Sequence, residues 1–166
     1  MQLLALPVGI VASVAVAYLW FLLAPVGEED PVSPGMLVLV FFAIIPIHEL
    51  IHAWVHPRSG LSNSSILGFW PSRLLFYAHY DGELPRNRFI AILLMPLLII
   101  SFAPLLICTV TGSSSVPFAF ASIFNALCAC GDIFGAGLVL VQVPSNATVR
   151  NQGWRTFFKI QEAGAD

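Results

Sequence analysis

Residues 36–55 read MLVLVFFAIIPIHELIHAWV. A helix that crosses a bilayer needs about 20 predominantly apolar residues, and this stretch has that length. Three other stretches also qualify, so we predict spans at about residues 3–24, 36–55, 89–110 and 116–142. The chain is 58% hydrophobic and 10% charged, whereas soluble domains carry about 25% charged residues. The predicted fold class is therefore an all-α membrane protein of four transmembrane helices, with residues 1–166 forming a single integral membrane domain.

The first predicted span lies close to the N-terminus, where a cleaved signal peptide is the alternative interpretation. No basic residue precedes it, and its apolar run exceeds the roughly 7–15 residues of a signal peptide. We therefore expect a retained helix.

Charged residues predict the orientation of these spans in the cell membrane. The segment after the first span is acidic, and the turn after the third span is neutral. All seven basic residues lie between the second and third spans or after the fourth. Because cytoplasmic segments are enriched in Lys and Arg, we predict a cytoplasmic loop at 57–87, a cytoplasmic tail at 143–166 and cytoplasmic N and C termini. The acidic residues are Glu28, Glu29 and Asp30, and the basic ones are Arg58, Arg73, Arg86, Arg88, Arg150, Arg155 and Lys159.

The loop between the second and third spans has the composition of strands. Residues Ile66 to Phe69 and Leu74 to Tyr80 are rich in aromatic and branched side chains, and Pro71-Ser72 lies between them. Such runs around a turn predict two short strands. We expect them to lie at the membrane surface, where aromatic rings are enriched.

The second span contains His48-Glu49-Leu50-Ile51-His52, the pattern H-E-x-x-H. On a helix, two histidines four residues apart project from one face and can bind a single zinc ion, while the Glu acts as general base toward a water molecule. Ionisable residues in an apolar helix cost about 2.5–3.5 kcal/mol each on insertion scales. The alternative is a polar cluster that packs against other helices without a metal.

A second intramembrane carboxylate, Asp132, lies in the fourth predicted span. In the four-span arrangement Asp132, His48 and His52 all fall in the cytoplasmic half of the membrane. Because catalytic zinc sites usually have three protein ligands, we predict that these three residues are the ligands. An Asp bonded to the backbone or to Asn125 is the alternative.

Several other residues have less specific interpretations. We expect His56 and His79 to be interfacial, and we expect Cys108, Cys128 and Cys130 to pack as small apolar residues. Asn125 could bind a substrate backbone or satisfy a neighbouring helix. Gly131 and Gly135 have the small-xxx-small spacing of closely packed helices, which would bring Asp132 near the second span. Prolines in the spans predict kinks at Pro46, Pro96 and Pro104.

The motif at 48–52, the strand-like loop and Gly131-Asp132 in a later span together resemble the site-two protease type of intramembrane zinc metalloprotease. More closely, they resemble the family described as putative zincin peptidases, over roughly Ile44 to Val149. The resemblance implies zinc bound by His48, His52 and Asp132, with Glu49 as the catalytic acid/base. The chain departs from the site-two proteases in having no Pro between Asn125 and Asp132.

The predicted function is hydrolysis of peptide bonds in a membrane protein or peptide substrate, with Zn²⁺ as cofactor and the lipid bilayer as surroundings. The alternatives are a non-catalytic zinc-binding sensor or scaffold and a metal-ion or proton transporter. A nucleic-acid partner is not expected, because the net charge is −2 and phosphate binding needs clustered basic residues. The oligomeric state stays open.

Overall fold

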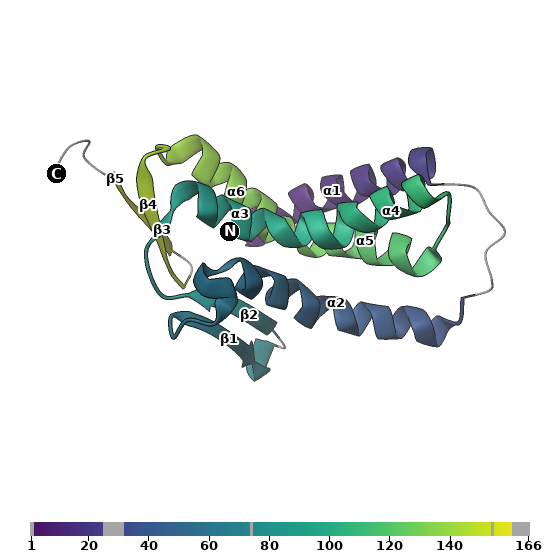
Figure 1. The fold of residues 1–166 in the computed structure, drawn as a ribbon, viewed down its shortest axis with the longest axis horizontal. Coiled ribbons are helices and arrows are strands. Elements are labelled where there is room, and N and C mark those ends of the chain that lie inside the picture. Colours follow the sequence, from purple (N-terminus) through teal and green to yellow (C-terminus); the bar gives the residue numbers. More distant parts are fainter. Residues whose placement is uncertain (1, 25–31, 74, 154, 161–166) are drawn as a thin grey trace.

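The computed structural model describes residues 2–24, 32–73, 75–153 and 155–160, and it is mostly helical (Figure 1). The acidic segment at 28–30, Leu74 and the end of the predicted tail lie outside the described residues. Helices α1 (Gln2–Leu23) and α2 (Pro34–Val55) coincide with the first two predicted spans. Helix α2 is capped by Ser33, whose side chain accepts a hydrogen bond from the Met36 N–H, and it continues through Pro46.

The third predicted span is one apolar helical stretch, Arg86–Thr111. It consists of α3 (Arg86–Pro96), a π-helical segment η3 (Leu97–Phe102) and α4 (Ala103–Thr111). Within η3 the helix is widened, because the Ala103 N–H bonds to the carbonyl of Leu98 five residues earlier. The helix is therefore locally widened just after Pro96, one of the positions where the sequence predicted a kink.

The fourth predicted span is broken and is not one continuous helix. It consists of α5 (Val116–Cys128) and α6 (Cys130–Gln142), which meet at Ala129 with a bend of 52°. By length and composition the described chain has three helices that could cross a membrane, or four if this bent pair is one span.

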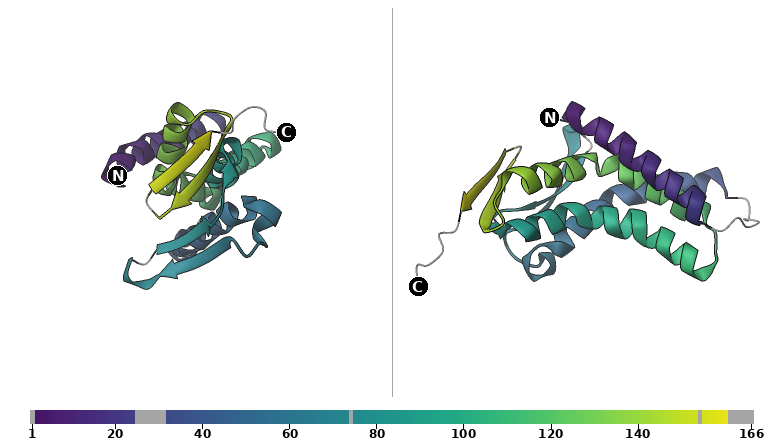
Figure 2. Two further views of the ribbon diagram at one scale, coloured as in Figure 1. Left: turned by 90° about the vertical axis from the view of Figure 1, so that its left-hand side faces the viewer. Right: turned by 90° about the horizontal axis from the view of Figure 1, so that it is seen from above.

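The helices pack as a bundle in which α5 and α6 lie between α1 on one side and α2 and α3 on the other (Figures 1 and 2). Only 17–22% of the residues in the most apolar window of each candidate span are buried. Large apolar side chains such as Phe21, Phe42 and Val110 therefore point outward, as expected for helices surrounded by lipid.

Two small sheets lie at one end of the bundle, where α2 ends and α3 begins (Figure 1). Strands β1 (Ser65–Trp70) and β2 (Leu75–Tyr80) form the hairpin that the sequence predicted, with turns η1 (Pro57–Gly60) before it and η2 (Pro71–Arg73) within it. The predicted tail was not expected to be a sheet, but β4 (Ala147–Gln152) pairs with β3 (Leu84–Pro85) on one edge and with β5 (Arg155–Ile160) on the other. This pairing puts the loop before α3 and the tail after α6 on the same side of the bundle, as a four-span topology requires.

The described chain has a close helix approach at Gly9 and not at the two glycines that the sequence suggested. A Cβ added at Gly131 would meet no atom within 4 Å, and one at Gly135 would meet only Leu93 Cδ1, at 3.6 Å. A Cβ added at Gly9 of α1 would lie 2.6 Å from Cys130 Cβ and 2.7 Å from the carbonyl oxygen of Leu127. Helix α1 therefore packs directly against the α5–α6 bend.

Candidate metal centre

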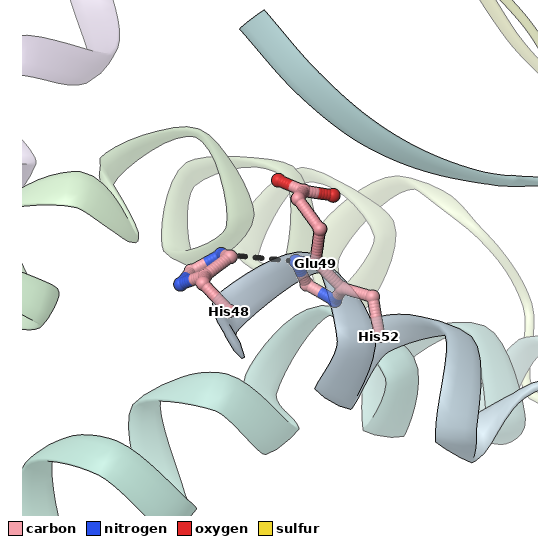
Figure 3. Close-up of side chains that lie close together, drawn as sticks. All are labelled: His48, Glu49 and His52. Atoms are coloured by element: carbon pink, nitrogen blue, oxygen red, sulfur yellow. Dashed lines mark hydrogen bonds between the residues drawn. The ribbon is translucent and has the colours of Figure 1, made fainter. Parts of the chain in front are cut away.

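His48 and His52 lie one turn apart on α2 and are both buried, with 6% and 5% of their surface exposed. Their rings are close together, with Glu49 beside them (Figure 3). The two Nε2 atoms are 3.1 Å apart. This local arrangement follows from the four-residue spacing, which places both side chains on the same face of a helix.

Asp132 reaches the two histidines from the first turn of α6. Its Oδ2 atom lies 3.0 Å from His48 Nε2 and 3.3 Å from His52 Nε2. The bend at Ala129 starts a new helix two residues before Asp132, so its carboxylate also lies at a helix N-terminus, where the helix dipole favours negative charge.

The other ring nitrogen of each histidine faces an atom that can only accept a hydrogen bond. The Nδ2 of Asn125 donates to the carbonyl oxygen of Pro96 at 3.1 Å, and this contact fixes the orientation of the amide. The amide Oδ1 therefore faces His48 Nδ1 at 2.8 Å, and the ring must donate. His52 Nδ1 likewise donates to the carbonyl oxygen of Ile92 at 2.8 Å.

These contacts determine what occupies the space between the three side chains. A neutral imidazole has a single N–H, and both rings carry it on Nδ1. While both rings are neutral, both Nε2 lone pairs and the Asp132 carboxylate therefore converge without a donor among them, which is unfavourable unless a metal ion or an added proton lies between them. Zinc with bonds of about 2.0–2.1 Å in tetrahedral geometry needs ligand atoms about 3.3–3.4 Å apart. The observed separations of 3.0–3.3 Å are close to this spacing, so the residues fit zinc.

Glu49 lies on the adjoining face of α2 and is partly buried. Its Oε2 accepts a hydrogen bond of 2.7 Å from the backbone N–H of Ala78 in β2. Glu49, His48 and His52 each offer a ligand atom within 4.8 Å of the others. Asp132 is nearer to both rings than this limit, and Glu49 is already held by β2. The structure therefore brings Asp132 together with both predicted histidine ligands and places Glu49 beside them.

Comparison with known protein families gives one match. Residues 41–148 match the family described as "Putative zincin peptidase". The chain belongs to this family. The match includes the H-E-x-x-H helix and Asp132, and the family description indicates a zinc-dependent metallopeptidase. No curated protein and no solved structure matches the chain.

Other residues of this zincin-family chain lie away from the centre or were not anticipated. His56, expected at the interface, is 2% exposed, and its Nδ1 lies 2.6 Å from Ser65 Oγ. Burial above all, together with electrostatic repulsion from His52, His79 and Arg88, lowers the pKa of His56 to about 4. Asn125 packs against its neighbours, since both polar atoms of its amide are bonded within the bundle. Ala78 and Ser101 were missed, because a backbone contact and a serine carry no distinctive motif.

Proposed function

We propose that the protein is an intramembrane zinc metallopeptidase of the site-two protease type, hydrolysing peptide bonds of membrane-associated substrates. One observation carries the proposal: two imidazole Nε2 atoms and a carboxylate oxygen from two apolar helices converge within 3.3 Å, while the Nδ1 atom of each ring faces a separate acceptor. Ionisable groups inside a membrane are energetically costly and usually mark a functional site, and a bound cation would offset that cost here.

The residues around the centre have separate roles in the proposed reaction. His48, His52 and Asp132 would hold the ion. Bound zinc supplies Lewis acidity, which polarises a scissile carbonyl and acidifies a water molecule. Glu49 takes the proton from the attacking water and returns it to the leaving amine. The Ala78 N–H orients the Glu49 carboxylate, and the surrounding apolar helices limit access of bulk water.

The outer edge of β2 is the proposed substrate-binding element. The Ala78 N–H points to Glu49, whereas the Asp81 N–H points to Ser64 of the β1 side. Backbone groups alternate along a strand, so those of Phe76 and Tyr80 share the outward direction of Ala78. In the described chain β2 pairs with β1 only. An extended peptide could therefore add to this edge beside Glu49.

The strand-addition proposal is tested by removing one outward N–H. Both Phe76→Pro and Phe76→Ala lose the aromatic ring, which contacts Phe69 at 4.6 Å between centroids. Only Phe76→Pro also loses the N–H. We expect a higher KM for Phe76→Pro than for Phe76→Ala, with zinc content equal in both. Equal KM values would contradict strand addition and leave the metal centre unaffected. Tyr77→Pro is unsuitable, because the Tyr77 N–H faces β1.

The function itself is tested by metal content and proteolysis of detergent-purified protein. We expect about one zinc per chain in the wild type, lost in His48→Ala and Asp132→Ala. Glu49→Gln should keep the zinc, because Glu49 is not a ligand, and lower the cleavage rate about 10²- to 10⁴-fold. Zinc binding without cleavage by any form would favour a sensor or scaffold. Absence of metal from chelator-free wild type would refute the proposal.

A further inference from the structure

Pro96 leaves a carbonyl of α3 free at the position where His52 needs a partner. In an α-helix the N–H of residue 96 would bond to the carbonyl of Ile92, four residues earlier. Proline has no N–H, and the Ile92 carbonyl instead accepts the hydrogen bond from His52 Nδ1 at 2.8 Å. The gap that Pro96 makes in the helix is therefore filled by a predicted zinc ligand.

Pro96 also connects to the other histidine through Asn125. The Asn125 side chain is fully buried and donates to the Pro96 carbonyl at 3.1 Å and to Ser101 Oγ at 2.9 Å. Ser101 belongs to the π-helical segment that follows Pro96, and π-bulges occur frequently at functional sites. These two donations leave Asn125 Oδ1 facing His48.

We propose that Pro96 and Asn125 are positioning residues that together hold His48 and His52 in the Nδ1–H tautomer, with both Nε2 atoms facing Asp132. The inference rests on the proposed zinc site and adds how its ligands are oriented. Metal-binding histidines depend on such partners, because a bonded second nitrogen fixes the tautomer and the ring orientation. Here position 96 of α3 affects both rings. Its missing N–H leaves the Ile92 carbonyl free to accept from His52, and its own carbonyl orients the Asn125 amide that accepts from His48.

The role of Asn125 is tested by zinc affinity, measured by competition with a chelator. Asn125→Leu removes the acceptor for His48 Nδ1, and we expect zinc to bind about 10- to 100-fold more weakly. Asn125→Asp keeps the acceptor for His48 Nδ1 but loses the donor to Pro96, so it should bind zinc more tightly than Asn125→Leu does. Ser122→Ala is the matched control: Ser122 is fully buried one turn away on α5 and bonds to Ile100 rather than to a histidine. It should leave the affinity unchanged.

A second measurement separates tautomer control from general packing. The chain has four histidines, so their ring nitrogens can be resolved by NMR with ¹⁵N-labelled histidine. In metal-free wild type at alkaline pH we expect Nδ1 of His48 to be protonated. In Asn125→Leu this ring should show mixed tautomers, whereas Ser122→Ala should retain the wild-type signal.

The role of Pro96 is tested with Pro96→Ala, which restores an N–H that competes for the Ile92 carbonyl. We expect weaker zinc binding, but a smaller loss than for Asn125→Leu, because a carbonyl oxygen can accept two hydrogen bonds. Pro104→Ala is the control. It makes the same backbone change in the same helical stretch, and the freed carbonyl there, Ile100, accepts from Ser122 instead of a ligand.

The possible outcomes separate this inference from the proposed function. If the wild type binds zinc and the variants Asn125→Leu and Ser122→Ala bind it with equal affinity, the role of Asn125 is refuted and the metal site is unaffected. Equal affinities for Pro96→Ala and Pro104→Ala would refute the role of Pro96. A wild type that binds no zinc would overturn both proposals.

Discussion

Replacing Asp132 with Asn exchanges one carboxylate oxygen for an amide nitrogen. We expect it to have opposite effects on the stability of the metal-free and the zinc-bound protein. In the metal-free wild type, Asp132 Oδ2 faces two Nε2 lone pairs at 3.0 and 3.3 Å. The amide of Asp132→Asn can donate to one of them, a hydrogen bond worth about 0.5–1.5 kcal/mol. We therefore expect the metal-free variant to be at least as stable as the metal-free wild type.

Zinc should reverse this order. At a concentration about 100 times its Kd, a ligand stabilises the folded state by about 2.7 kcal/mol. For a chain of about 150–250 residues, each kcal/mol raises Tm by about 2–4 °C. The wild type should thus gain about 5–11 °C with zinc. Asp132→Asn should gain almost nothing, because the carboxylate ligand is lost.

The assay is thermal unfolding in detergent, with chelator and with zinc. The matched control is Asp81→Asn, the same chemical change at an exposed carboxylate that pairs with Arg150 at 2.9 Å, away from the centre; it should keep the full zinc shift. A zinc shift retained by Asp132→Asn would show that Asp132 is not a ligand. A metal-free variant much less stable than metal-free wild type would show that Asp132 pairs with an imidazolium instead.

Two further predictions concern stability. Gly9→Ala should lower the free energy of unfolding by up to about 2 kcal/mol, because overpacking against Leu127 and Cys130 costs about 1–3 kcal/mol and removing a helical Gly regains about 1 kcal/mol. The control is Gly137→Ala, whose added Cβ meets nothing within 4 Å and which should be neutral or stabilising. Equal effects of the two substitutions in thermal unfolding would contradict the close packing of α1. The pKa of His56 is about 4 in the folded state and 6.5 in the unfolded state, so the unfolded state takes up a proton first as the pH falls. The contribution of neutral His56 to the free energy of unfolding should therefore be fully present above pH 6.5 and decline toward pH 4. His56→Phe should lose less stability than the wild type over this range in metal-free protein, and identical pH profiles would show that His56 does not contribute.

The elements that the sequence predicted well are those governed by local patterns. Apolar runs of about 20 residues identify helices in lipid, and α1, α2 and the stretch from Arg86 to Thr111 lie where they were expected. The hairpin β1–β2 follows from branched and aromatic residues around Pro71. By contrast, the tail strand β4 pairs with the distant β3 as well as with β5, and no local pattern predicts which distant segment a strand pairs with.

The candidate centre divides in the same way. The spacing of His48 and His52 alone places two imidazoles on one face of a helix, and the cost of a carboxylate in an apolar run marks Asp132, so the sequence by itself determined which side chains are candidates. Only the tertiary structure decided how they are arranged. The bend at Ala129, the carbonyl freed by Pro96 and the amide of Asn125 belong to other helices. Hydrogen bonds between helices depend on three-dimensional packing and leave no periodicity in the chain.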